Sequence, residues 1–218
     1  MTESGPVEAV ISDFGGVLTS SLQSAFEAFE DASGVPLEAL GMAMARIGVA
    51  RGSNPLHDLE TGRLSEADFL RGLGDQLTEQ LGRSVSLEDF GERYFSHLQP
   101  NSALIDYMRD LRARGYQLAI CTNNVREWAD RWRAMLPVAE LFDVVVDSAF
   151  VGARKPEPRI YELTLEQLGV DAGRALLIDD IEANCEGARR VGMHAVWFRS
   201  NEQAIADVEA VLAGDGSG

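Results

Sequence analysis

The segment Ala175-Leu176-Leu177-Ile178-Asp179-Asp180 joins a continuous apolar run to two adjacent carboxylates. An apolar run without polar alternation is typical of a strand that is buried on both faces of a parallel sheet. Four more apolar runs occur, at residues 9–11, 118–121, 144–146 and 195–198. Helical patterns separate the later runs, and one of these helices is expected to end at Gly169. This alternation of strands and helices predicts an α/β fold built on an open parallel sheet.

The first two apolar runs lie much farther apart than one crossover helix requires. The intervening chain carries helix signals, among them Phe69, Leu73 and Leu77 at four-residue spacing. Ser65 precedes this pattern as a capping residue, and Ser86 marks a second helix start. We therefore predict a Rossmann-like core formed by residues 1–19 and 99–218, with a helical cap inserted at residues 20–98.

The excess of acidic over basic residues argues against nucleic acids and anionic membranes as partners. The chain of 218 residues has 19 basic and 35 acidic residues, for a net charge of −16. Nucleic acids and anionic membranes bind basic surfaces, so neither is expected as a partner. No apolar run is long enough for a membrane helix, and residues 1–8 lack the basic and apolar segments of a signal peptide. Cys121 and Cys185 are expected as buried, reduced thiols, which favours a cytoplasmic protein. The sequence leaves open whether the protein is a monomer or a homodimer.

Polar residues stand where several predicted strands end. Asp13 follows the first, Thr122-Asn123 the second and Asp179-Asp180 the fourth, while Lys155 lies in the loop after the third. In open α/β sheets, ligands bind at the carboxyl ends of the strands. Taken singly, each residue has an ordinary explanation as a cap, a turn or a solvated charge. Two adjacent carboxylates at a buried strand end repel each other unless a cation compensates them, and Mg²⁺ is the simplest such cation.

The order of these residues resembles the haloacid dehalogenase superfamily of hydrolases, in the branch that carries a helical cap. The segments Val151–Tyr161 and Ile178–Met193 match that branch closely, and the likeness covers nearly the whole chain. The resemblance implies a phosphatase for a small phosphorylated metabolite, such as a sugar phosphate. Asp13 would be the nucleophile that forms an aspartyl-phosphate, and Lys155 would neutralise the charge that develops there.

The resemblance also implies the binding residues. Thr122 and Asn123, together with Lys155, would bind the phosphoryl oxygens. Mg²⁺ would be held by Asp13, by the backbone carbonyl of Gly15 and by Asp180, with Asp179 sharing or supporting the shell. Asn184 stands where members of the superfamily often carry an acid behind the metal ligands.

Position 15 departs from the pattern of the superfamily. The first motif normally reads Asp-x-Asp, and the second carboxylate protonates the leaving group and later activates water. Here Gly15 supplies only a carbonyl. Losing an acid–base group typically slows a reaction by ~10²–10⁴-fold, so we expect activity to favour good leaving groups. Thr19 or Ser20 could place a hydroxyl near the position of the missing carboxylate, although the simpler interpretation is that both are ordinary polar residues of a loop or helix start.

Other functions stay open at this point. A haloacid dehalogenase would use the same nucleophile without metal, but it has little use for Asp179-Asp180 and usually carries an aromatic residue at position 15. A catalytically silent relative that binds a phosphorylated ligand is favoured only by Gly15. A mutase that transfers phosphate between sugar positions would need an acid or base from the cap.

The remaining histidines and a tryptophan pair have structural interpretations. His57, His97 and His194 show no ligand spacing, and we expect structural roles for them. Trp128 and Trp132, four residues apart, are expected on one packing face of a helix.

Overall fold

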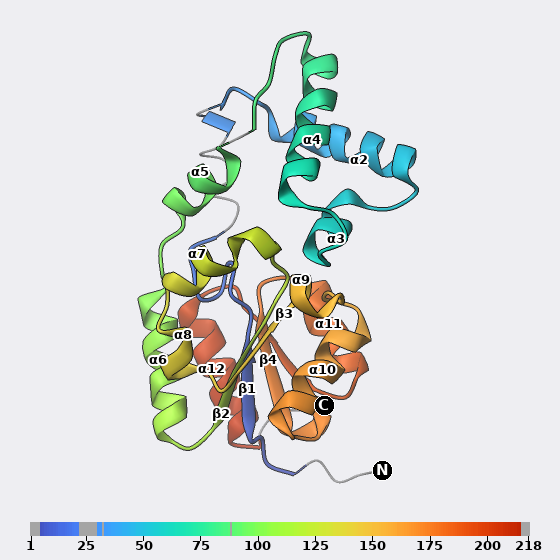
Figure 1. Ribbon diagram of the computed structural model, residues 1–218. Helices are drawn as coiled ribbons and strands as arrows, with labels where there is room; N and C mark the ends of the chain where they lie inside the picture. The colour runs from blue at the N-terminus through green and yellow to red at the C-terminus, as the bar shows by residue number, and fades with distance from the viewer. Residues whose placement is uncertain (1–4, 22–29, 32, 88, 215–218) are drawn as a thin grey trace.

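A five-stranded parallel sheet forms the centre of the protein (Figure 1). The computed structural model describes residues 5–21, 30–31, 33–87 and 89–214. The strand order is β3-β2-β1-β4-β5. The strands are β1 (Ala9–Ser12), β2 (Gln117–Thr122), β3 (Val144–Asp147), β4 (Ala175–Asp179) and β5 (His194–Trp197). Each overlaps one of the predicted apolar runs, which confirms the α/β class.

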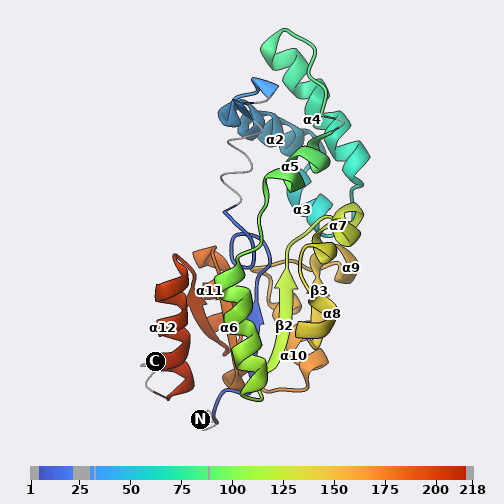
Figure 2. The same ribbon diagram turned by 90° about the vertical axis from the view of Figure 1, so that its left-hand side faces the viewer.

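Helices cover both faces of the sheet (Figures 1 and 2). One face is covered by α6 (Ser102–Ala113), α7 (Ala129–Ala134), α8 (Val138–Leu141) and α12 (Asn201–Leu212). The other is covered by α10 (Pro158–Leu168) and α11 (Glu182–Arg190). The helix α10 ends at Gly169, as predicted, in a left-handed conformation with φ of 71°. Short connections are η1 (Arg126–Trp128), α9 (Ser148–Val151) and η2 (Ala172–Arg174).

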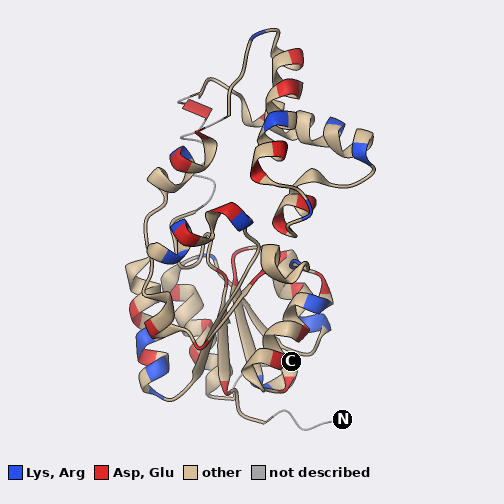
Figure 3. Ribbon diagram, viewed as in Figure 1, with Lys and Arg blue, Asp and Glu red and all other residues tan. Residues whose placement is uncertain are grey.

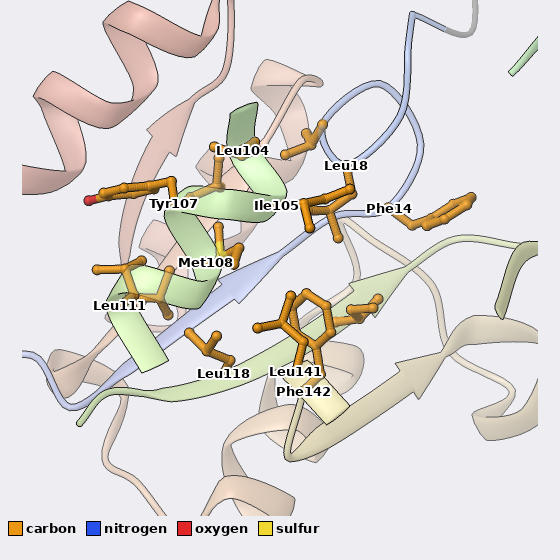
Figure 4. Packing of buried hydrophobic residues seen from close by; sticks show 14 of the residues in the cluster. Phe14, Leu18, Leu104, Ile105, Tyr107, Met108, Leu111, Leu118, Leu141 and Phe142 are labelled. Atoms are coloured by element: carbon orange, nitrogen blue, oxygen red, sulfur yellow. The ribbon is translucent and has the colours of Figure 1, made fainter. Parts of the chain in front are cut away.

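Side chains alternate across the strands and build two apolar layers. In β1, Val10 packs into the layer beneath α6, whereas Ala9 and Ile11 pack toward α10 and α11. Leu104, Met108 and Leu111 of α6 are fully buried against the first layer; Figure 4 shows them facing β1 and β2. Both cysteines are buried and unpaired, consistent with the expected free thiols. These layers fix the strand ends that carry the polar residues.

A separate group of helices lies between β1 and α6 in sequence and beyond the carboxyl edge of the sheet in space (Figure 1). It comprises α2 (Leu37–Arg51), α3 (Pro55–Glu60), α4 (Glu66–Leu81) and α5 (Phe90–His97). These helices share a hydrophobic cluster of their own. Residues 22–29, 32 and 88 of the predicted cap lie outside the described residues, and the boundaries 20 and 98 stay a prediction.

The two helix starts predicted in this region differ in outcome. The helix α4 begins after Ser65, whose hydroxyl accepts a hydrogen bond from the Asp68 N–H, as the capping pattern predicts. The helix α5 starts at Phe90 rather than at Ser86. The Val85 N–H donates to Thr78 Oγ1 and Leu87 is buried in the cluster. The segment after α4 therefore packs back on that helix before α5 begins.

The inserted helices contact the core at several places. Where the chain crosses between them, Thr19 bridges Pro100 and the Ser20 N–H donates to the Gln99 carbonyl at 2.7 Å. At another place, Glu60 at the end of α3 forms an ion pair of 2.6 Å with Arg154. Both groups are largely buried, so this contact ties α3 to the loop that carries Lys155.

The expectation of one packing face for the two tryptophans is wrong. Trp132 is buried in the core, where its indole N–H donates to Asp147 at 3.3 Å. Trp128 instead packs against the helices of the inserted region and stacks on Tyr94. A 3₁₀ turn ends at Trp128 before α7 begins, and this changes the angular spacing between the two side chains.

Charged residues are interspersed along the outer helices (Figure 3). On α6, for example, Arg109 pairs with Asp106, and Arg114 just beyond the helix pairs with Glu209 of α12. Within the described part of the chain, no helix is both long and apolar enough to span a bilayer.

Candidate active site

The carboxyl edge of the sheet holds the candidate site. The Asp13 N–H donates to the Ile178 carbonyl at 2.9 Å, which extends the pairing of β1 with β4 by one residue. Asp13 therefore lies beside Asp179, the last residue of β4. Thr122 ends the neighbouring strand β2 and is almost completely buried. Strand order and register thus place these side chains together, at the edge that faces the inserted helices (Figure 1).

Lys155 lies at the centre of the site. Its side chain is 0% exposed, and its Nζ lies 2.8 Å from Asp13 Oδ1 and 2.6 Å from Asp179 Oδ2. It is the single lysine of the chain, in which the other 18 basic residues are arginines. An ammonium group is compact and can bridge two carboxylates within a narrow space, whereas a guanidinium needs a wider planar gap.

Asn123 positions the Lys155 backbone. Its Oδ1 accepts from the Lys155 N–H at 2.8 Å, and its Nδ2 donates to the Lys155 carbonyl at 3.0 Å. This reciprocal pair fixes the loop after β3 to the end of β2. The polar atoms of the Asn123 side chain are therefore used within the protein.

Three carboxylates, Asp13, Asp179 and Asp180, form what we call the aspartate cluster. Each offers an oxygen within 4.8 Å of the others. Asp179 is fully satisfied: Oδ1 accepts from the Ile181 N–H and the Asn184 amide, both at 2.9 Å, and Oδ2 accepts from Lys155. The predicted place of Asn184 behind the carboxylates agrees with this contact.

Asp180 differs from its neighbour. Its Oδ1 is buried and has no hydrogen-bond partner among the described residues. A buried oxygen of a carboxylate without a donor is costly, and a hard cation is a suitable partner for it. The three carboxylates of the aspartate cluster therefore fit a hard divalent cation such as Mg²⁺.

The loop after β1 packs against Asp180. Gly16 has a φ of 78°, and a Cβ added there would lie 2.2 Å from Asp180 Oδ2. The Phe14 N–H donates to Asp13 Oδ1 at 2.7 Å, which orients the carboxylate. Gly15 lies between these two contacts, so its carbonyl belongs to the same turn.

The pKa values of the charged groups in the site are shifted by burial and by the charges of their neighbours. Burial raises the pKa of Asp13 to about 7, with Lys155 opposing the shift and the other two carboxylates adding to it. Burial and the negative charge of Asp179 raise the pKa of Asp180 to about 6. Burial acts to lower the pKa of Lys155, but Asp13 and Asp179 outweigh it and hold that pKa well above its ordinary value. Without a metal, the cluster therefore carries an excess of negative charge that one ammonium group only partly compensates.

Two groups from the inserted helices were not found from the sequence. Glu60 reaches the loop of Lys155 through Arg154, and its backbone carbonyl accepts a hydrogen bond of 2.5 Å from the Ser148 hydroxyl. Burial raises the pKa of the Tyr94 phenol on α5, and the negative charges of Asp13 and Asp180 add to this shift. Neither residue belongs to a recognisable spacing pattern, since both depend on how the helices pack over the sheet.

A sequence profile of the haloacid dehalogenase-like hydrolases matches residues 7–192. The chain belongs to this family. The match includes the aspartate cluster, Lys155 and the inserted helices, and it confirms the resemblance inferred from the motifs.

Relatives of this hydrolase include proteins named as phosphatases. Phosphatase MT3486 of Mycobacterium tuberculosis is 34% identical over 223 residues, covering 96% of this chain and 99% of the relative. A glyceraldehyde 3-phosphate phosphatase of Pyrococcus abyssi is 39% identical over 92 residues, 41% of this chain and 38% of the relative. The mouse protein named Acyl-CoA dehydrogenase family member 10 is 31% identical over 211 residues, which are 94% of this chain. The hydrolase spans only 19% of that protein's length.

Solved structures share the fold. A HAD-like hydrolase of Porphyromonas gingivalis superposes with a TM-score of 0.69 at 23% identity, covering 95% of this chain and 98% of that chain. A HAD family enzyme of Bacteroides thetaiotaomicron, solved with magnesium and inorganic phosphate, has a TM-score of 0.63 at 23% identity, covering 88% and 94%. At this level of identity the likeness establishes the architecture of the HAD-like hydrolase.

Proposed function

We propose that this hydrolase is a Mg²⁺-dependent phosphatase that acts on a small phosphorylated metabolite through an aspartyl-phosphate at Asp13. The observation that carries the proposal is the buried, unpartnered Oδ1 of Asp180, next to a carboxylate that Lys155 and a backbone N–H orient. The phosphatase names of two relatives support the reaction class, and the magnesium and phosphate of the Bacteroides enzyme support the metal.

The proposed ligands of Mg²⁺ are Asp13, Asp180 and the backbone carbonyl of Gly15. When bound, the metal would neutralise charge on the phosphoryl group and on the aspartate cluster. Asp179 is proposed to support the site, because its oxygens are already engaged by Lys155, Asn184 and a backbone N–H. This arrangement lets a chain of net charge −16 accept an anionic substrate, because the nearby cations outweigh the distant field.

The remaining proposed roles belong to side chains and backbone groups at the ends of β1 and β2 and in the loop after β3. Asp13 would attack phosphorus, and its carboxylate is held in place by Lys155 and the Phe14 N–H. Lys155 would stabilise the charge that develops as the bond forms. We propose that the Thr122 hydroxyl and the Asn123 backbone N–H bind phosphoryl oxygens, since both lie at the end of β2.

The inserted helices are proposed to act as the cap. One of their contacts with the core is made by Glu60, which pairs with Arg154 and whose backbone carbonyl accepts from Ser148. Arg154 is adjacent to Lys155, so the cap touches the loop that carries the central ammonium group. A cap in this position would exclude water while the aspartyl-phosphate forms, and it would select the substrate.

The test is phosphate release from a panel of aryl and sugar phosphates, with Mg²⁺ and with EDTA, for the wild type and Asp13→Asn. Turnover that needs both Mg²⁺ and Asp13 is the expected result. Folded protein that binds Mg²⁺ and a phosphate mimic but releases nothing would favour the catalytically silent alternative. Halide release from 2-haloacids in EDTA, without phosphate release, would favour the dehalogenase.

A further inference from the structure

One residue of the inserted helices, Glu60 at the end of α3, binds the core through both its side chain and its backbone. Its Oε2 accepts from Arg154 Nε at 2.6 Å, and only 15% of the Glu60 side chain and 14% of the Arg154 side chain are exposed. Its carbonyl accepts a hydrogen bond of 2.5 Å from the hydroxyl of Ser148, the first residue of α9. Arg154 directly precedes Lys155 in the chain. Glu60 therefore holds both ends of the segment 148–154, which leads from β3 to Lys155.

The segment 148–154 has little regular structure of its own. It consists of α9, which is four residues long, and a turn at Gly152 with a φ of 70°. A helix this short is unstable by itself, so contacts with other parts of the protein must hold it in place. The bond between Glu60 and Arg154 joins two charged groups, and such a hydrogen bond is roughly twice as strong as a neutral one. The position of the segment therefore depends on its contacts with Glu60.

The same segment is joined to the end of β2. The Asn124 N–H donates to Ser148 Oγ at 3.0 Å. The side chain of the preceding residue, Asn123, bonds to both backbone groups of Lys155. Thr122, which is proposed to bind a phosphoryl oxygen, directly precedes these two asparagines. A shift of the segment would therefore change the positions of Lys155 and of the end of β2 together.

The turn after α3 lies directly on α9. Gly62 has a φ of 69°, and a Cβ added there would lie 2.6 Å from the carbonyl oxygen of Ala149. The Arg126 guanidinium donates to the same carbonyl. Because the two backbones approach this closely, Glu60 is held at a fixed place relative to α9 while the inserted helices lie on the core.

We infer that Glu60 is a positioning residue for Lys155, and that the loop of Lys155 takes its active arrangement when the inserted helices lie on α9. This inference rests on the proposed phosphatase function. Glu60 acts through Arg154 and Ser148, and the group that it positions is the ammonium group 2.8 Å from Asp13.

A positioning role predicts which kinetic constant changes. Lys155 is proposed to stabilise charge that develops in the transition state, so its displacement should lower kcat more than it weakens substrate binding. A misplacement of about 1 Å in a reacting or stabilising group can slow a reaction by ~10²-fold. Because Asn123 and Asp179 still hold Lys155, we expect a smaller loss, of about 10-fold, when Glu60 no longer holds the segment.

The experiment measures kcat and KM for p-nitrophenyl phosphate and a sugar phosphate at saturating Mg²⁺, per mole of protein shown by urea unfolding to be folded. Glu60→Ala and Ser148→Ala each release one end of the segment 148–154, and each should lower kcat by about 10-fold with KM changed less than about twofold. The double variant should lose little more than either single variant, since loss of one end already frees the segment.

Two further variants complete the comparison. Glu60→Gln can still accept a hydrogen bond from Arg154, so it should recover part of the kcat that Glu60→Ala loses, and it replaces Glu60→Ala if that variant does not fold. The matched control is Glu166→Gln, because Glu166 pairs with Arg159 on the exposed side of α10 and should behave like the wild type.

A purely structural role of Glu60 would lower the free energy of unfolding and leave kcat per folded molecule unchanged, whereas direct contact with substrate would raise KM. Either result, or a loss in the double variant equal to the product of the two single losses, would overturn the positioning role while leaving the phosphatase proposal intact. A wild type that hydrolyses none of the esters would overturn the proposed function, and the role of Glu60 with it.

Discussion

Replacing Lys155 by methionine removes the ammonium group but keeps a long apolar side chain in the same space. In the wild type, this group is fully buried and pairs with Asp13 at 2.8 Å and Asp179 at 2.6 Å. The variant leaves the aspartate cluster without its cation. Breaking a buried ion pair by removing one partner typically lowers the free energy of unfolding by ~3–5 kcal/mol. In a chain of this size, such a loss lowers Tm by roughly 6–20 °C.

The loss of unfolding free energy in Lys155→Met should depend on pH. The direction of this dependence follows from the raised pKa values of the carboxylates. The pKa values of Asp13 and Asp180, about 7 and about 6, already exceed the value of 3.8 for an ordinary aspartate. Without the ammonium group they rise further, so the folded variant holds protons that the unfolded chain releases. Stability is then lost as the pH rises from about 4 through the folded pKa values. The deficit of Lys155→Met relative to the wild type is therefore smaller at pH 5 than at pH 8.

Urea unfolding at pH 5 and pH 8, in EDTA and in Mg²⁺, measures this deficit. Mg²⁺ should restore part of the loss at pH 8, because a divalent cation replaces some of the missing positive charge. Arg109→Met, which removes an exposed partner of Asp106, is the control and should unfold like the wild type under all conditions. A deficit of the same size at both pH values would refute the electrostatic reasoning and point to altered packing.

Three further predictions concern the same site. Gly16→Ala should raise the Kd for Mg²⁺ by ~10–100-fold in calorimetry, because the new Cβ displaces the Asp180 carboxylate; an unchanged Kd would contradict the contact. Mg²⁺ should raise the Tm of the wild type more at pH 8 than at pH 5, since protons compete with the metal for the raised-pKa carboxylates; equal shifts would speak against binding there. An amine-selective acylating reagent should leave Lys155 unmodified in the native protein and modify it after unfolding; rapid native modification, detected by mass spectrometry, would show that its ammonium group is accessible.

The sheet was predictable because each strand is a short, continuous apolar run. A short apolar run such as Ala175–Asp179 fits a strand that is buried on both faces of a parallel sheet. The helix start at Ser65 was also predictable, since its capping bond is local. The start of α5 was not, because the burial of Leu87 depends on the tertiary cluster rather than on neighbouring residues.

The candidate site was predictable in part for the same reason. Asp13, Thr122 and Asp179 stand at strand ends, and the topology of a parallel sheet brings strand ends together. The engagement of the Asn123 side chain with the Lys155 backbone depends on the path of the loop after β3, which no spacing rule describes. The place of Tyr94 depends on the packing of the inserted helices over the core, and Trp128 was misassigned because a 3₁₀ turn interrupts the helical spacing.

The most direct test of the central proposal is to trap the covalent intermediate. The protein is mixed with Mg²⁺ and a phosphate ester that it hydrolyses, quenched in acid, reduced with borohydride and mapped by peptide mass spectrometry. A modification at Asp13 that requires Mg²⁺, and that is absent in Asp13→Asn, is the predicted result. Phosphate release that continues in folded Asp13→Asn, or a modification on a different residue, would contradict it.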